Sequence, residues 1–167
     1  MKIKRMFLVT IAILVILLTS CSSFCNTKSN DKKGEKMDLS ILQGKTWQLI
    51  KVKKTGKNIE LNRDQMNTIQ QENMFTLIFK DKNISGKGFP NNYSGQITNQ
   101  DNRKLSFPPI VSTRMALLTN TNNLLLQEDE YFQLLQKTTS WDIKDNNLIL
   151  NTVDNENKEA KLIYNIK

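Results

Sequence analysis

Trp141-Asp142-Ile143-Lys144-Asp145-Asn146-Asn147-Leu148-Ile149-Leu150 is the stretch that decides the fold. Trp141 and Ile143 alternate with polar residues, and the apolar residues return after a short polar run. Side chains two residues apart lie on one face of a β-strand, and Asp and Asn are typical of tight turns. The stretch therefore predicts a β-hairpin.

The same two-residue period extends outward through the chain. Alternating apolar residues recur around 74–80, where Phe75, Leu77 and Phe79 share one face, and again around 105–107 and 162–166. Near 47–52 the pattern predicts that Trp47 and Leu49 lie on one strand face, with Ile50 and Val52 on the other. Short strands at regular spacing, separated by polar turns, predict a meander that closes on itself.

One segment, 124–138, has helical rather than strand spacing, with Tyr131, Leu134, Leu135 and Thr138 on one side. Its acidic triplet Glu128–Glu130 lies near the N-terminal end, where the helix dipole favours anions. We interpret the triplet as part of a solvated face rather than as a cation site. A shorter helix is predicted around Asp64–Gln71. The predicted fold is thus mainly β with one principal α-helix, as a small antiparallel β-barrel or strongly curved sheet.

The N-terminus carries a targeting signal. Lys2, Lys4 and Arg5 precede an uncharged apolar run that ends in Leu18-Thr19-Ser20-Cys21. This order is typical of a secretory signal peptide, and the run is short for a membrane-spanning helix. A retained membrane anchor is the alternative interpretation.

The tetrapeptide resembles the bacterial lipobox, which implies lipidation of Cys21 and cleavage just before it. We therefore predict a lipoprotein signal peptide at 1–20, a lipidated flexible tether at 21–37 and a folded domain at 38–167. Ser22, at the second mature position, favours outer-membrane sorting if the cell has two membranes. Cys25 is interpreted as an ordinary tether residue, with an intermolecular disulfide as the minor alternative.

The charge balance says little about partners. The net charge is +8 and falls to +5 when the three N-terminal cations are removed. For an exported protein, such a surplus indicates attraction to an anionic lipid or acidic polymer rather than to nucleic acid. We expect no nucleic-acid partner, a membrane partner through the Cys21 anchor, an envelope protein partner and a monomer.

No reaction is specified by the sequence. The chain has no His, which is the commonest general base and metal ligand. Ser29 and Lys32 have the spacing of some acylating enzymes, but they fall in the predicted tether. Gly44-Lys45-Thr46 lacks the upstream glycine of a phosphate-binding loop. We therefore predict no catalytic residue, no metal site and no cofactor.

The domain resembles the META domain family of bacterial envelope proteins, which is also called HslJ-like. Its most specific parts are the Gly- and Asn-rich stretch Ile84–Gly95 and the pair Leu105–Phe107 and Ser112–Ala116, within a likeness that covers about 39–166. The resemblance implies a compact antiparallel β-barrel or curved sheet with a helix at one side. It also implies envelope association, in some members with heat stress and novobiocin tolerance, and no catalytic residues.

Two cysteines common in the family are missing here. Pro90, between Phe89 and Asn91, and Leu117 stand in their places. The resemblance implies that the two positions are spatial neighbours, with apolar contact in place of a disulfide. Asn91 and Arg114 would then flank one spot, and we take them as the candidate functional patch. For Arg114 we favour a structural ion pair or a carbonyl contact over a ligand contact.

The leading functional hypothesis is a non-enzymatic envelope lipoprotein that supports envelope integrity or stress and antibiotic tolerance through a partner. One alternative is a lipocalin-like carrier, which would need an apolar cavity lined by Trp47, Phe75, Phe79 and Tyr164. Another is a proteinaceous inhibitor of an exported hydrolase, which would need a protruding loop at Asn91–Gly95 or Thr119–Asn123.

Overall fold

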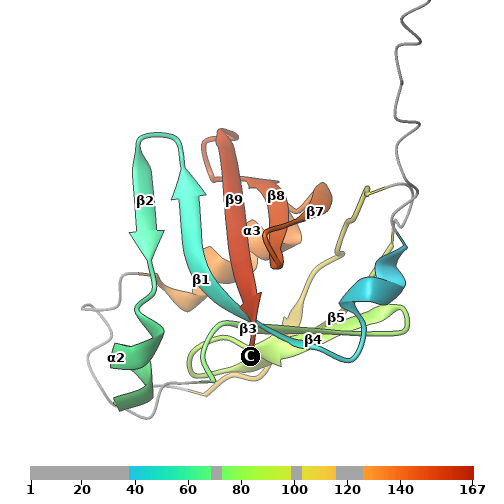
Figure 1. Cartoon of the computed structure of the whole chain (residues 1–167), viewed down its shortest axis with the longest axis horizontal. Helices are drawn as coiled ribbons and strands as arrows, with labels where there is room; N and C mark the ends of the chain where they lie inside the picture. Colours follow the sequence, from blue (N-terminus) through green and yellow to red (C-terminus); the bar gives the residue numbers. More distant parts are fainter. Residues whose placement is uncertain (1–37, 69–72, 99–102, 116–125) are drawn as a thin grey trace, which may run out of the picture. The chain divides into compact units, whose positions relative to one another are not determined.

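The computed structural model describes residues 38–68, 73–98, 103–115 and 126–167 (Figure 1). The predicted signal peptide, the tether and Cys21 lie outside the described residues. Within the described ranges, no helix has the length and apolar character needed to cross a membrane. The described strands and helices are η1 (Leu39–Leu42, a 3-10 helix), β1 (Thr46–Lys54), β2 (Lys57–Glu60), α2 (Arg63–Thr68), β3 (Thr76–Lys80), β4 (Asn83–Lys87), β5 (Asn92–Gln96), β6 (Val111–Ser112), α3 (Glu128–Gln136), β7 (Ser140–Lys144), β8 (Asn147–Val153) and β9 (Glu159–Ile166).

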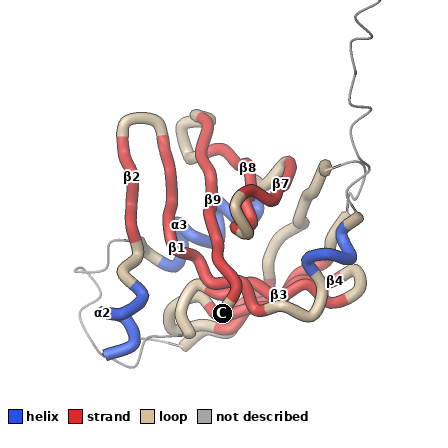
Figure 2. Tube along the Cα trace, in the orientation of Figure 1, coloured by secondary structure: helices blue, strands red, loops and turns tan. Residues whose placement is uncertain are grey.

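The predicted hairpin is confirmed as β7 and β8, which appear as adjoining red segments in Figure 2. Trp141 pairs with Leu150, and Lys144 pairs with Asn147 at the closed end. The two turn residues, Asp145 and Asn146, have φ values of 52° and 61°. Asp and Asn tolerate this left-handed conformation, which two-residue hairpin turns require.

The described strands form one antiparallel sheet of nine strands, in the order β6-β5-β4-β3-β1-β9-β8-β7, with β2 paired to the side of β1. The sheet is not closed into a barrel, so the barrel form of the prediction is wrong. Beyond β7, the Leu105 N–H donates to the Thr139 carbonyl, but Lys104 forms only an isolated bridge with Ser140. Pro108 and Pro109, which lack N–H groups, separate this segment from β6 along the chain.

A β-bulge in β1 changes which residues face the core. Leu49 pairs with Tyr164 of β9, whereas Lys51 pairs with Ile163, so Ile50 is an extra residue in the ladder. The expected alternation is therefore shifted, and Val52 is fully buried on the same side as Leu49. The prediction that Val52 shares the Ile50 face is wrong.

The segment predicted as the strand 74–80 begins as a strand only at Thr76. Phe75 has a φ of 53°, outside the β region, and this breaks the alternation. Its ring instead packs edge-on against Tyr131, with the ring centroids 5.1 Å apart. Leu77 and Phe79 keep the predicted buried positions.

The principal helix is confirmed in type, although α3 begins at Glu128 rather than at Leu124. Leu124 lies outside the described residues. The buried face of α3 packs against β8 and β9, on the inner side of the sheet (Figure 1). The shorter predicted helix corresponds to α2, whose described part is Arg63–Thr68, and the predicted end at Gln71 lies outside the described residues.

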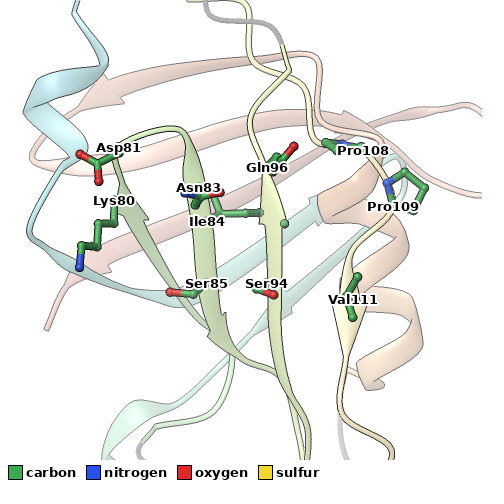
Figure 3. A pocket seen from close by; sticks show the side chains of 11 residues that line it. Lys80, Asp81, Asn83, Ile84, Ser85, Ser94, Gln96, Pro108, Pro109 and Val111 are labelled. Atoms are coloured by element: carbon green, nitrogen blue, oxygen red, sulfur yellow. The ribbon is translucent and has the colours of Figure 1, made fainter.

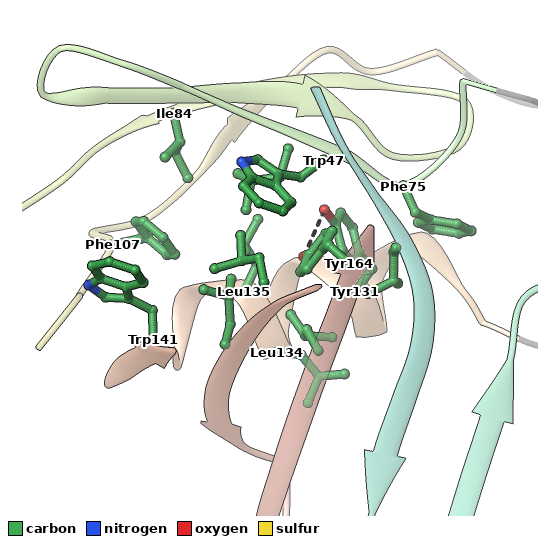
Figure 4. Packing of buried hydrophobic residues seen from close by; sticks show 14 of the residues in the cluster. Trp47, Phe75, Ile84, Phe107, Tyr131, Leu134, Leu135, Trp141 and Tyr164 are labelled. Atoms are coloured by element: carbon green, nitrogen blue, oxygen red, sulfur yellow. Dashed lines mark hydrogen bonds between the residues drawn. The ribbon is translucent and has the colours of Figure 1, made fainter. Parts of the chain in front are cut away.

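The core lies between this inner face and α3 (Figure 4). Trp47 and Trp141 are both buried, as the strand pattern predicts, with exposed fractions of 1% and 2%. The Trp47 indole N–H donates to the Leu42 carbonyl over 3.2 Å, which ties η1 to the sheet. A buried indole satisfied in this way combines a large apolar area with a specific contact.

Candidate functional site

Asn91 is the centre of the candidate site and is only 7% exposed. Its backbone N–H donates to Glu128 Oε1 at 2.8 Å, and its side-chain Nδ2 donates to Glu128 Oε2 at 2.6 Å. Its Oδ1 accepts from the Thr113 hydroxyl at 2.9 Å and from the Met115 N–H at 2.6 Å. One buried amide therefore joins the turn before β5, the segment after β6 and the first turn of α3.

The acidic triplet at the start of α3 is divided between three environments. Glu128 is held by Asn91, and Glu130 forms an ion pair with Lys54 on β1, whereas Asp129 is exposed. All three lie in the first turn, where the helix dipole favours them as predicted. The triplet is not simply a solvated face, because two of its carboxylates make specific contacts. No group of side chains that could hold a metal ion is found among the described residues.

The glycine-rich stretch allows close packing around this corner. A Cβ on Gly88 would lie 2.5 Å from Glu128 Oε1 and 2.8 Å from the Phe132 ring. A Cβ on Gly86 would overlap the Thr76 carbonyl oxygen and lie 2.7 Å from the Tyr93 hydroxyl. The glycines thus let β4 approach α3 and the buried tyrosines, which is a structural role.

Arg114 and Asn91 line the same hollow of about 410 Å³, together with the nearby residues Ser112, Thr113, Met115, Glu128, Asp129 and Phe132. The structure therefore brings the two predicted patch residues together, although their functional role stays a prediction. Asn91 is buried and serves as a support, whereas Arg114 is exposed and has no ion-pair partner among the described residues. The expected structural ion pair of Arg114 is not found within that part of the chain.

The neighbourhood of Pro90 and Leu117 that the family resemblance implies is not tested by the described residues. Leu117 lies outside the described residues, so its distance from Pro90 stays a prediction. Its near neighbour Met115 does contact Asn91, next to Pro90. The described backbone thus brings Met115 to Asn91, while the neighbourhood of Pro90 and Leu117 itself stays a prediction.

The surface beside the hollow exposes apolar side chains that sequence reasoning missed. Val111 is 71% exposed and Met115 is 60% exposed, which are the highest values among the large hydrophobic residues of the described structure. A larger hollow of about 660 Å³ lies on the outer side of β4 and β5, where Ser85, Ser94 and Val111 are in one row (Figure 3). These exposures depend on the place of β6 at the sheet edge, which a local sequence pattern does not give.

A second polar cluster lies inside the core. The Tyr93 hydroxyl donates to the Thr76 carbonyl at 2.7 Å and lies 3.1 Å from the Tyr131 hydroxyl. The Tyr164 hydroxyl donates to that of Tyr131 over 3.3 Å (Figure 4). Burial raises the pKa of Tyr131 to about 12, against the effects of these hydrogen bonds and of the Arg63 charge.

Arg63 connects this cluster to the bulge in β1. Its guanidinium donates to the carbonyls of Leu49 and Met74, while its Nε is buried without a hydrogen-bond partner. Burial lowers the pKa of Arg63 to about 10, against the influence of Tyr131 and Tyr164. The sequence shows Arg63 only as the residue before a predicted polar helix, so its internal role was missed.

The observations that would favour the two alternative functions are absent from the described residues. Trp47, Phe75, Phe79 and Tyr164 are at most 1% exposed and pack into the core instead of lining a described hollow. Asn92–Gln96 is strand β5, paired on both sides, so the Asn91–Gly95 segment is not a protruding loop. Thr119–Asn123 lies outside the described residues.

An open antiparallel sheet with one covering helix, joined by a buried asparagine, defines a small β-rich domain. The chain belongs to the META domain family, whose model matches residues 40–162. The family prediction is thereby confirmed.

Solved structures with this fold include a protein from Burkholderia xenovorans determined by NMR, with a TM-score of 0.53 and 21% identity over 77% of this chain and 85% of that chain. Another NMR structure has a TM-score of 0.51 and 23% identity over 78% of this chain and 95% of that chain. At these identities the likeness concerns the fold alone. A comparison with curated proteins found no match.

Proposed function

We propose that this chain is a non-enzymatic lipoprotein of the bacterial cell envelope, anchored through Cys21, that binds an envelope partner. Through that partner it supports envelope integrity or tolerance of stress and antibiotics. It acts as a monomer and does not bind nucleic acid. The Leu18–Cys21 tetrapeptide supports the anchor, and family membership is compatible with the location.

One observation carries the binding role. Arg114 and Met115 are exposed, and they lie in the segment directly after β6, which is fixed to buried Asn91. Interaction sites are typically exposed side chains on a rigid support, since little conformational freedom is then lost on binding. The Met115 N–H and the Thr113 hydroxyl both donate to Asn91, so this segment is held in place while the side chains of Arg114 and Met115 face solvent.

The anchor is tested by intact-mass analysis and membrane fractionation. The wild type should carry acyl chains on an N-terminus at Cys21, and Cys21→Ser should release the domain from the membrane fraction. Two acyl chains are enough for stable anchoring. An N-terminus elsewhere without lipid would refute this part of the proposal.

The binding role is tested by photo-cross-linking in the producing cells, before and after heat shock. A photoreactive residue at Met115 should give a discrete cross-linked product. The control replaces Lys144, which is also exposed but lies at the β7–β8 turn. The same products from both positions, or none from Met115, would contradict a partner at this site.

A further inference from the structure

Within the described residues, the edge of the sheet at β6 has open main-chain hydrogen-bonding positions. β6 pairs only with β5 among the described strands. The Thr113 N–H donates to the Asn92 carbonyl, so the next pair in register, Tyr93 with Ser112, is of the non-hydrogen-bonded kind. The N–H and C=O groups of Ser112 therefore point away from β5, toward the side where another strand would lie.

The other described edges are protected differently. β7 has Lys104 bridged to Ser140 on its outer side. β2 presents the charged residues Lys57 and Glu60, and charged side chains on an edge oppose further strand pairing. By contrast, Val111 in β6 and Met115 just after it are the most exposed large hydrophobic residues described.

Hollows lie on both faces of the sheet along β6. Val111 pairs with Ser94, so both side chains point to the outer face and line the 660 Å³ hollow with Pro108 and Pro109 (Figure 3). Ser112 pairs with buried Tyr93 and so faces the helix side, where it lines the hollow with Arg114. Alternate side chains of an added strand would point into these two hollows in turn.

We propose that β6 is a docking edge for an extended peptide segment of a partner, which adds to the sheet as a further strand. This inference rests on the proposed function and names the chemistry of its partner. Open main-chain groups select an extended backbone, and flanking hollows select alternate side chains. In the added peptide, the side chain that lies next to Val111, Pro108 and Pro109 is apolar. A second copy of this chain is a poorer occupant, because pairing two strands of two residues each buries little area.

The test pans a display library of random linear peptides against the full chain. Enriched peptides should have alternating apolar residues. Ser112→Pro removes an N–H that β5 does not use, and Val111→Asp places a charge at the apolar contact. Each should weaken binding by about tenfold or more. Ile166→Asp, at another exposed aliphatic residue, should not, and melting followed by circular dichroism checks that all three variants fold.

A backbone readout separates strand addition from general adhesion. N-methylation of every second residue of an enriched peptide removes main-chain donors. Two such peptides are made, one methylated at the odd residues and one at the even residues, and one of these two phases should abolish binding. Equal binding to Ser112→Pro, insensitivity to N-methylation in both phases, or no enrichment would overturn strand addition at β6. If Met115 still cross-links to a partner in the Ser112→Pro variant, the proposed function stands and only this inference fails. If Met115 gives no product, the proposed function fails whatever the peptides do.

Discussion

Both carboxylate oxygens of Glu128 are occupied by Asn91, one by its backbone N–H and the other by its side-chain amide. Replacement of Asn91 by Ala leaves the Met115 N–H and one Glu128 oxygen without this partner. Leaving such partly buried groups unsatisfied should lower the free energy of unfolding by about 1–2 kcal/mol. Urea unfolding measures the change. Asn92→Ala, at the exposed neighbour, is the control and should stay within about 0.5 kcal/mol of wild type; equal effects would contradict the role of Asn91.

Gly86 and Gly95 provide a matched pair for the packing around β4. An alanine Cβ at Gly86 would overlap the Thr76 carbonyl oxygen, whereas at Gly95 the nearest atom is 3.5 Å away, which is an ordinary contact. Gly86→Ala should therefore cost about 3 kcal/mol, near the upper end for an overpacked core, and Gly95→Ala should cost much less. Thermal unfolding compares them. Similar melting temperatures for the two variants would contradict this packing.

Tyr131 should make the stability sensitive to high pH. Its pKa is raised to about 12 in the folded state by burial, whereas an unfolded tyrosine titrates near 10. The folded state therefore binds more protons in this range, and this part of the stability is complete below pH 10 and is lost as the pH rises toward 12, at up to about 1.4 kcal/mol per pH unit.

Tyr131→Phe should reduce that alkaline slope in urea unfolding curves. Arg63, whose pKa is lowered to about 10 by burial, acts in the opposite direction, and Tyr131 raises that pKa. Without the Tyr131 hydroxyl the pKa of Arg63 should fall further, which also reduces the alkaline loss of stability. At neutral pH the variant should lose about 1 kcal/mol for the missing hydroxyl contacts. Parallel pH dependence in both proteins would show that Tyr131 does not titrate as described.

The positions of Pro90 and Leu117 predict an engineered disulfide. In a Cys25→Ser background, Pro90→Cys with Leu117→Cys should oxidise in air, if the Cα atoms lie about 4.4–6.8 Å apart. The bond should add about 2–4 kcal/mol, less any strain and lost apolar contact. Thiol titration and non-reducing electrophoresis detect it, with the two single-cysteine variants as controls. Persistent free thiols in the double variant would remove the account in which apolar contact replaces a disulfide.

Local patterns predicted the parts of the fold that depend on near neighbours. The β7–β8 hairpin and its Asp145–Asn146 turn follow from a few adjacent residues, as does the apolar side of α3. The bulge at Ile50 was missed because nothing near it in the sequence signals a break. Its carbonyl accepts from the Leu61 N–H, and Arg63 binds the carbonyl of Leu49, so distant residues hold it in place.

The same limit applies to the candidate site. The family resemblance selected Asn91 and Arg114, but it did not show that Asn91 is a buried support and that Arg114 is exposed. The partners of Asn91 lie 22 and 37 positions further along the chain, at Thr113 and Glu128. The folded backbone decides which of several polar residues a buried amide binds. Local sequence spacing does not encode that choice of partner.

The sharing of Asn91 among three segments also affects how the molecule opens. Backbone hydrogen exchange occurs through local unfolding of cooperative units. The first turn of α3 and the segment from Thr113 to Met115 do not depend on each other through regular secondary structure, yet each loses a partner when the Asn91 amide moves. Their slow-exchanging amides should thus share one opening free energy, so that fraying of the helix start loosens the β6 edge at the same time.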